Sequence, residues 1–333
     1  IATGKIILKR PPIILVHGIW SGPETWETFE KQLNSNGQFI IEKADYSKKG
    51  SNEVYDAAGS LSQNYPVIDD HITEALKKVK NQHIVANKVD VVAHSMGGLL
   101  TREYCRQEPA ACKKQIRKLI TIDTPHRGSE LADWLWLHEK DKDAFYNQLA
   151  IRGIRNNQNS CDMKIRAFVD DGQAVPYGIP LDKKVGVHPV AGAVRDLATG
   201  NVAPIEVFPG AWNLLSPLSH EVRTHAMIGR MSAILPKTLE ALPKGVGMEI
   251  WWLDTQLLNA CGLDRNEMFG SNGSDGVVSA SSQSGGLWSP HITYIPLVVD
   301  HLLVHHQSEV VDITKELLDE KMGPSFVEVN GGP

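Results

Sequence analysis

The chain has 333 residues, of which 42% are hydrophobic, and it carries a formal net charge of −5. This length can bury a large core, so we expect one large domain over residues 1–333 rather than a small scaffold. The sequence has no long basic run and no stretch of eighteen apolar residues. Composition therefore argues against a nucleic-acid partner and against a membrane-spanning helix.

Predicted strands and helices alternate along the chain. Apolar runs of strand length predict strands at residues 13–16, 38–44, 89–93, 118–123, 225–229 and 291–298. Helical periodicity predicts helices at residues 23–33, 68–79 and 309–318, and one that runs from just after Ser95 to residue 104. This alternation is typical of βαβ units around a parallel sheet. Between about residues 129 and 222 the pattern loosens and Pro and Gly recur, which indicates an inserted lid or cap region.

A candidate nucleophile follows the predicted strand at residues 89–93. The segment HSMGG, residues 94–98, leads from that strand into a helix. Such a strand-to-helix turn holds a serine in a strained conformation with small neighbours, which is the pattern of a nucleophile elbow. Ala93 takes the place of the first glycine of G-x-S-x-G, and Gly97 keeps the second. Chance occurrence at a helix start is the alternative, but the strand context favours Ser95 as a nucleophile.

The loop after the first predicted strand has the sequence His17-Gly18-Ile19-Trp20. Gly18 allows a close approach of the backbone to the elbow. We predict that the backbone N–H groups of Ile19 and Met96 form an oxyanion hole, where each donor typically contributes about 3 kcal/mol. Trp20 is predicted to line the substrate pocket, with plain packing as the alternative.

A serine nucleophile needs a base and an acid that orients the base, and behind a nucleophile elbow the acid follows later in the chain. The sequence offers a candidate for this acid. Asp275 occurs in the turn SDGVV, residues 274–278, ahead of apolar residues. A turn aspartate is often only a local cap. Its place between Ser95 and a late histidine favours it over the other late aspartates, Asp254, Asp264 and Asp300.

Three histidines cluster after the last predicted strand. His301 comes first, where the catalytic histidine belongs, so we predict it as the base. His305 is the alternative, although it and His306 are expected to open the final helix and can be surface residues. His126, His138 and His188 could gather as a metal site, but no HExxH pair occurs, so no metal site is predicted.

Together these segments resemble bacterial triacylglycerol lipases and related α/β-hydrolase esterases. The most specific matches are TPHRGS at residues 124–129 and SDGVV at residues 274–278, within a resemblance that runs from residue 13 to about 310. It implies an α/β-hydrolase fold with a mostly parallel sheet, flanking helices and a helical lid. It also implies a Ser95, Asp275 and His301 triad. Trp134 to Leu137 would suit a lid facing lipid, or a helix packed on the sheet.

One departure from that family concerns calcium. Many secreted lipases of this group hold a structural calcium partly through an aspartate two residues after the catalytic histidine, and here that position is Leu303. Asp254 could match the other ligand, but one carboxylate is a poor site for an ion that takes six or more oxygens. We predict no essential calcium and no cofactor.

The cysteines bear on location. Cys105, Cys112, Cys161 and Cys261 fit no CxxC metal site,. Cys105 and Cys112 are close enough to form a disulfide, with reduced thiols as the alternative. The amino terminus lacks a signal-peptide layout, and a start at Ile1 leaves both a removed leader and a trimmed chain open. We expect a secreted or extracytoplasmic location.

The predicted function is a serine carboxylic-ester hydrolase, a lipase or esterase, that works through an acyl-enzyme. The long insertion favours medium- to long-chain acyl esters as substrates. We also expect transient contact with a lipid interface and a monomeric state. A phospholipase, thioesterase, amidase or acyltransferase could use the same triad. A non-catalytic binding protein is less favoured, because all three triad residues are present.

Overall fold

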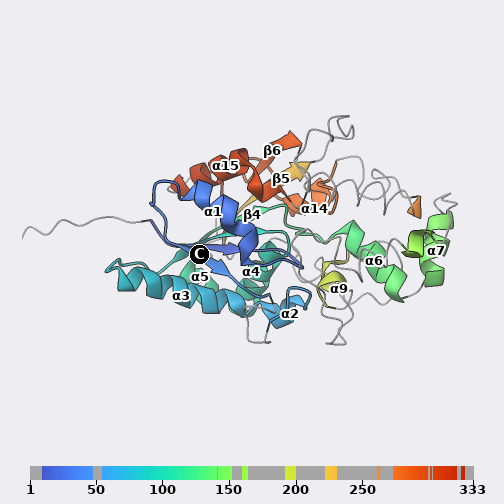
Figure 1. Ribbon diagram of the computed structural model, residues 1–333, viewed down its shortest axis with the longest axis horizontal. Helices are drawn as coiled ribbons and strands as arrows, with labels where there is room; N and C mark the ends of the chain where they lie inside the picture. The colour runs from blue at the N-terminus through green and yellow to red at the C-terminus, as the bar shows by residue number, and fades with distance from the viewer. Residues whose placement is uncertain are drawn as a thin grey trace, which may run out of the picture.

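In the computed structural model the described residues are 10–47, 55–140, 142–151, 160–163, 192–199, 222–230, 261–262, 273–298, 301, 303–320 and 324–326. They form a six-stranded sheet with helices on both faces (Figure 1). The strands are β1 Ile13–Val16, β2 Ile41–Ala44, β3 Val89–His94, β4 Ile116–Ile122, β5 Arg223–Arg230 and β6 Ile292–Val298.

The sheet order is β2-β1-β3-β4-β5-β6, and every neighbouring pair is parallel. Strand β1 therefore lies between β2 and β3, and the direction in which the chain adds strands reverses there. In open parallel sheets the crevice at such a reversal, outside the carboxyl ends of the strands, is where ligands bind. The loops after β1 and β3 meet at this place.

Two helical layers cover the sheet. One contains α3 Val67–Asn81, α4 Met96–Gln107 and α5 Pro109–Gln115, with the short α2 Leu61–Asn64 beside α4. The other contains η1 Pro23–Trp26, α1 Glu27–Leu33, η4 Val304–His306 and α15 Ser308–Asp319. Figure 1 shows α1 and α15 on the side of the sheet opposite to α3. The short helix α14 Ala280–Ser284 packs against β5.

Alternation along the strands divides the core in two. In β1 all four side chains are fully buried; Ile14 and Val16 pack with the α3 and α4 layer, and Ile13 and Leu15 with the α1 and α15 layer. A strand covered on both faces reads as a continuous apolar run. Burying each such side chain contributes about 1.5–3 kcal/mol. The mostly parallel α/β-hydrolase sheet predicted from the sequence is confirmed.

Most predicted elements are confirmed within a few residues, with two informative differences. Strand β2 begins three residues later than predicted, because the Asn34 side chain holds both backbone groups of Phe39 in a turn (2.9 and 3.1 Å). His305 and His306 do not open the last helix. They lie in η4, and His305 is buried, so the expectation that it can be a surface residue is wrong.

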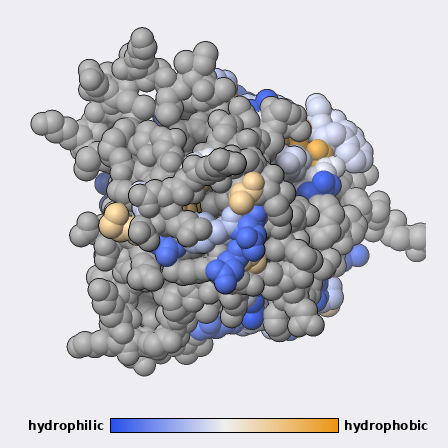
Figure 2. All heavy atoms as spheres, turned by 90° about the vertical axis from the view of Figure 1, so that its right-hand side faces the viewer, coloured by the Kyte–Doolittle hydropathy of each residue, from blue (hydrophilic) through white to orange (hydrophobic). Residues whose placement is uncertain are grey.

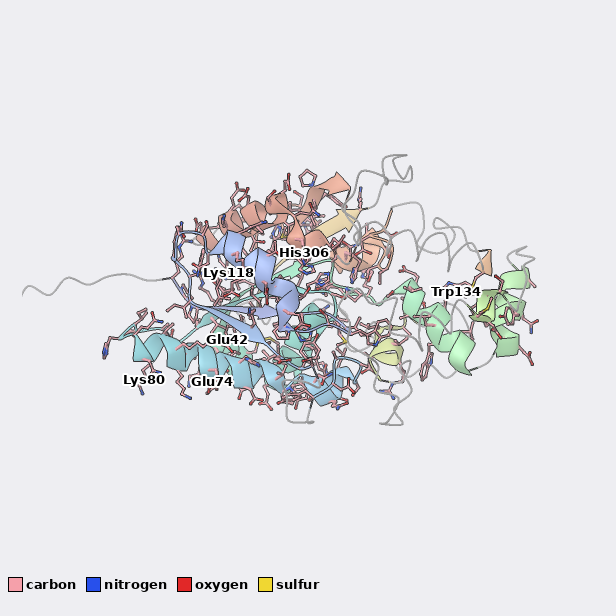
Figure 3. All side chains as sticks on the ribbon, viewed as in Figure 1. Glu42, Glu74, Lys80, Lys118, Trp134 and His306 are labelled. Carbon is pink, nitrogen blue, oxygen red and sulfur yellow. A yellow bond between two sulfur atoms is a disulfide. The ribbon has the colours of Figure 1, made fainter. Side chains whose placement is uncertain are left out.

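The predicted insertion lies largely outside the described residues. Its described helices are α6 Glu130–Lys140, α7 Lys142–Ile151 and α9 Ala193–Leu197, and α6 and α7 extend beyond the carboxyl edge of the sheet (Figure 1). Trp134 of α6 is labelled in Figure 3. Its ring meets the ring of Phe145 of α7 edge to face, with centroids 5.5 Å apart. Leu135 and Leu137 are buried as well. Trp134, Leu135 and Leu137 are therefore buried within the hydrophobic cluster that α6 shares with α7 and α9.

The face at that end of the molecule is shown in Figure 2. Its described residues are mainly hydrophilic, with isolated hydrophobic ones between them. A lid that presents an apolar surface to lipid stays a prediction. No helix in the described part of the chain is long and apolar enough to cross a bilayer.

Two disulfides link the cysteines. Cys105 of α4 bonds to Cys112 of α5, as one of the two alternatives anticipated. Cys161 bonds to Cys261, a pairing that the sequence did not predict, across a separation of 100 residues. Cross-linking removes loop-closure entropy from the unfolded chain, and the effect grows with loop length.

Removal of the long-range disulfide is expected to cost more stability than removal of the local one. Replacing Cys161 and Cys261 by Ala should lower the unfolding free energy by about 4–5 kcal/mol, and replacing Cys105 and Cys112 by about 2–3 kcal/mol. Urea denaturation of the two double variants measures both. Equal losses would contradict the loop-length argument.

Candidate active site

Ser95 stands alone between two elements, since β3 ends at His94 and α4 begins at Met96. Its backbone has φ 53° and ψ −129°, a strained conformation for a residue other than glycine,. The Ser95 N–H donates to the Ile122 carbonyl at 3.0 Å, which ties the turn to the end of β4. This is the geometry of a nucleophile elbow, as the sequence predicts.

The elbow requires glycine at position 97. A Cβ atom there would lie 2.5 Å from the carbonyl oxygens of both Val16 and His17. Only a hydrogen at that position lets the first turn of α4 approach the end of β1. The same residue that completes the G-x-S-x-G pattern thus brings the β1 loop against Ser95.

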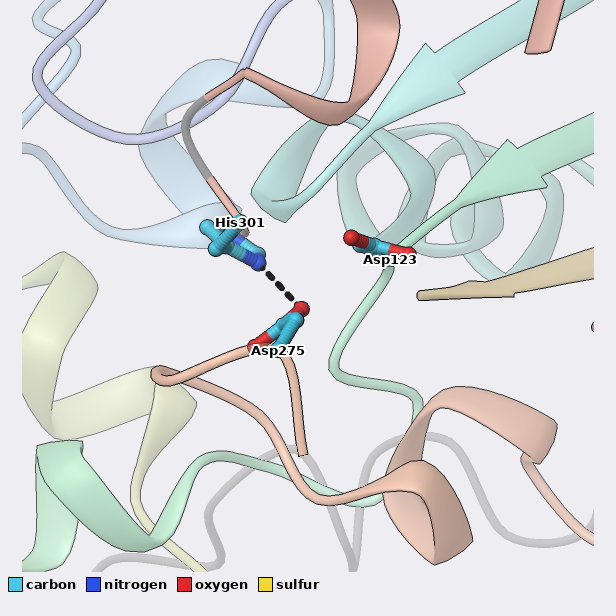
Figure 4. Close-up of side chains that lie close together, drawn as sticks. All are labelled: Asp123, Asp275 and His301. Carbon is cyan, nitrogen blue, oxygen red and sulfur yellow. Dashed lines mark hydrogen bonds and ion pairs between the residues drawn. The ribbon is translucent and has the colours of Figure 1, made fainter. Parts of the chain in front are cut away.

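Three of the predicted residues come together at the carboxyl edge of the sheet. His301 Nε2 lies 2.7 Å from Ser95 Oγ. His301 Nδ1 lies 2.6 Å from Asp275 Oδ2, and Figure 4 shows this second contact. All three are at least 95% buried. The imidazole is thus placed to accept a proton from the serine while its other nitrogen donates to the carboxylate.

The acid is fixed by its own loop. Asp275 Oδ1 accepts the backbone N–H groups of Val277 and Val278 at 2.9 and 2.7 Å. The His301 N–H donates to the Asp275 carbonyl at 3.0 Å. One carboxylate oxygen is therefore held by two backbone donors, and the other faces the imidazole.

Two further histidines stand behind His301. His94 Nε2–H donates to the His301 carbonyl at 2.7 Å and so holds the backbone of that loop. The His305 ring lies 4.6 Å from the His94 ring, centroid to centroid, but His305 Nε2 contacts Thr25 Oγ1 at 2.7 Å. The structure brings His301, and not the alternative His305, to Ser95. His306, which Figure 3 labels, contacts the Thr25 carbonyl through Nε2 at 3.2 Å.

The β1 loop lies against the nucleophile. A Cβ atom on Gly18 would be 3.3 Å from Ser95 Oγ. Among the described residues, the N–H groups of Ile19 and Met96 donate to no hydrogen-bond acceptor. Trp20 follows with φ 54°, and its N–H donates to the Ala57 carbonyl. The predicted oxyanion and pocket roles of these residues stay predictions.

Residues 124–129, with the sequence TPHRGS, make hydrogen bonds within the fold, one of them to the loop that carries Asp275. Arg102 donates to His126 Nδ1 at 2.9 Å, so that His126 Nε2–H faces Thr121 Oγ1 at 3.0 Å. Ser129 Oγ donates to the carbonyl of Val277, two residues after Asp275, at 2.6 Å. His126 is thus engaged in the fold, while His188 and the His138 side chain lie outside the described residues.

Asp123 is a site residue that the sequence reasoning missed. It leaves β4 at φ 50°, is fully buried, and accepts the Gly229 N–H at 2.7 Å. One ligand-capable atom each of Asp123, Asp275 and His301 lies within 4.8 Å of the others (Figure 4). A carboxylate that ends an apolar strand at the carboxyl edge of the sheet was the available signal.

Among the described residues, these three side chains lie close enough together to hold a metal ion. His301 Nδ1 and Asp275 Oδ2 already satisfy each other, which favours a proton-transfer arrangement over a metal centre,. Leu303, at the position compared with a calcium ligand, is buried and apolar. Asp254, Asp264 and Asp300 lie outside the described residues, so the absence of an essential calcium stays a prediction.

Comparison with known proteins places the chain in a family. The family model of the PGAP1-like alpha/beta domain matches residues 9–197, more than half of the chain. This protein belongs to that family. The matched region holds the β1 loop and the elbow, whereas Asp275 and His301 follow it.

Two of the relatives with a matching segment are named triacylglycerol lipases. "Triacylglycerol lipase 2" of Saccharomyces cerevisiae is 34% identical over 132 residues, 39% of this chain and 34% of that protein. A triacylglycerol lipase of Burkholderia plantarii is 28% identical over 142 residues, 40% of this chain and 35% of that protein. The chain thus spans about a third of the length of these relatives. The mature Bacillus licheniformis lipase BlEst2 shares the fold, with a TM-score of 0.50 at 17% identity over 93% of this chain and 92% of that one.

Buried histidines make stability depend on pH. Burial lowers the pKa of His17 to about 4 and holds the pKa values of His94, His126 and His305 well below their ordinary value of 6.5. The unfolded chain binds these protons near pH 6.5 and the folded chain does not. These four histidines therefore do not reduce the unfolding free energy above about pH 7, and they reduce it increasingly as the pH drops toward 4.

The expected slope is up to about 1.4 kcal/mol per pH unit for each histidine. Urea denaturation between pH 7.5 and 5 measures it. The variant His126→Asn, which removes one of these groups, should have a slope smaller by up to that amount. An unfolding free energy that stays constant or rises on acidification would contradict the prediction.

Proposed function

We propose that this protein is a serine carboxylic-ester hydrolase. The observation that carries the proposal is the continuous pair of hydrogen bonds from Ser95 Oγ through His301 to Asp275. A buried serine in a strained turn has no packing reason to face an imidazole that is in turn held by a carboxylate. The same three groups acting in series are what nucleophilic acyl transfer requires.

The proposed reaction begins when His301 Nε2 takes the proton of Ser95 Oγ as that oxygen attacks the ester carbonyl. Negative charge then develops on the carbonyl oxygen, and the N–H groups of Ile19 and Met96 would donate hydrogen bonds to that oxygen. The C–O bond to the alcohol breaks, and His301 gives its proton to the departing alcohol. Water repeats the sequence on the acyl-enzyme and releases the acid. Asp275 orients the imidazole throughout and stabilises its charged form.

The substrate we propose is a lipid ester with a medium or long acyl chain. Support comes from the relatives named triacylglycerol lipases. Contact with a lipid interface, a monomeric state and an extracytoplasmic location complete the proposal. The pairing of all four cysteines supports that location, because disulfides persist in oxidising compartments,.

Hydrolysis of p-nitrophenyl esters from acetate to palmitate tests the reaction. Ser95→Ala and His301→Ala should each lower kcat by about 10⁴-fold or more, because the nucleophile and its base act as a unit. His305→Gln, which keeps a nitrogen donor facing Thr25, should retain most of the activity. Activity that survives Ser95→Ala, or a wild type that cleaves no ester, would contradict the proposal and favour a binding protein of this fold.

Neutralising the two carboxylates near His301, those of Asp275 and Asp123, should have very different effects on kcat. Asp275→Asn is expected to lower kcat by about 10⁴-fold, because an amide facing Nδ1 favours the wrong imidazole tautomer. Asp123→Asn is expected to lower it less than tenfold, since Asp123 is held by Gly229 rather than by the imidazole. Steady-state kinetics on p-nitrophenyl butyrate compare them. A larger loss in Asp123→Asn would assign the acid role to Asp123.

A further inference from the structure

Tyr46, just past the end of β2, contacts the loop that follows β1. Its hydroxyl donates to two successive carbonyl oxygens, 2.5 Å from that of His17 and 3.0 Å from that of Gly18. The Tyr46 side chain is fully buried, and its ring stacks on the His17 ring with centroids 3.9 Å apart and planes 6° from parallel. The stacking fixes the ring, and the ring fixes where the hydroxyl points.

The direction of one peptide bond follows from these contacts. The Gly18 carbonyl and the Ile19 N–H belong to the same planar trans peptide, so they point in opposite directions. The Gly18 oxygen accepts from Tyr46 on one side of the loop and also from His17 Nδ1–H at 2.9 Å. The Ile19 N–H must therefore point away from Tyr46.

The nucleophile also lies against this loop. Gly18 approaches Ser95 so closely that an added Cβ would meet Ser95 Cβ at 2.9 Å. A hydrogen bond from the Trp20 N–H to the Ala57 carbonyl holds the next peptide of the loop. With one peptide held by Tyr46 and the next by Ala57, the Ile19 N–H has little freedom to rotate.

We propose that Tyr46 is a positioning residue for ester hydrolysis, whose hydroxyl aims the Ile19 N–H at the oxygen that becomes negatively charged in the transition state. The inference rests on the proposed function. Preorganised donors stabilise a transition state because they need no reorientation when charge appears. Tyr46 itself touches no reacting atom.

The charge states of both donors suit this role. Burial raises the pKa of Tyr46 well above its ordinary value of 10, and it lowers the pKa of His17 to about 4. At neutral pH the tyrosine keeps its proton and the imidazole is neutral. Neither places a charge next to the site, and both remain able to donate to the Gly18 carbonyl.

Tyr46→Phe in the full chain tests the inference, because it keeps the stacked ring and removes only the hydroxyl. On p-nitrophenyl butyrate we expect kcat to fall 10- to 100-fold, less than the roughly 10²- to 10³-fold loss of a whole oxyanion donor. KM should change less than twofold. The affinity for butylboronic acid, whose tetrahedral adduct with Ser95 resembles the transition state, should fall by the same factor as kcat/KM.

Tyr104→Phe is the matched control. The Tyr104 hydroxyl is likewise shared by two acceptors, Asp69 Oδ1 at 2.9 Å and Gln115 Oε1 at 2.7 Å, but these lie on α3 and α5. It should lose stability without losing kcat or boronate affinity. A general loosening of the fold would lower kcat in both variants, whereas positioning lowers it in Tyr46→Phe alone.

A second pair of variants tests the same carbonyl without changing the tyrosine. His17→Leu removes the other donor to the Gly18 oxygen and should lower kcat at constant KM. His17→Asn, whose amide can donate from a similar position, should recover part of that loss. Wild-type kcat and boronate affinity in both Tyr46→Phe and His17→Leu would overturn the inference and leave the Ser95 result intact. A wild type without Ser95-dependent hydrolysis would overturn the proposed function first.

Discussion

The approach of α4 to the end of β1 is the constraint on which the site depends. At Gly97 the first turn of the helix lies so close to the carbonyl groups of Val16 and His17 that no side chain fits between them. That contact places the strained serine, and the Met96 N–H at the start of α4, beside the β1 loop,. A larger residue at position 97 would separate the nucleophile from its predicted oxyanion donors.

Around that contact, the remaining groups come from distant parts of the chain. The acid loop after β5 and the histidine after β6 reach the elbow only because parallel strands place their carboxyl ends at one edge,. Short hydrogen bonds then fix them: Asp275 through the backbone of its own turn, and His301 through His94 and Asp275. The sheet supplies proximity, and these local bonds supply orientation.

The sequence predicted the central sheet well, because most of its strands contain a short apolar run, continuous in β1, that marks a strand buried between two helical layers,. It also pointed to Ser95, Asp275 and His301, since the order of these residues in the chain follows from the order of the strands. It did not single out Asp123, although this residue ends a predicted strand at the carboxyl edge of the sheet. It could not find Tyr46, because the proposed role of Tyr46 depends on the two carbonyl groups that its hydroxyl meets, and a spacing pattern carries no information on such contacts.

The same limit explains the cysteines. The sequence predicts Cys105 and Cys112 as a possible pair because they are only seven residues apart, whereas the partner of Cys161 lies 100 residues away. That second bond has a consequence for the integrity of the molecule. Strands β1 to β4 precede Cys161 and strand β6 follows Cys261. A protease that cuts once between these cysteines leaves the piece with Ser95 covalently joined to the piece with His301, and only a reductant would release the two fragments.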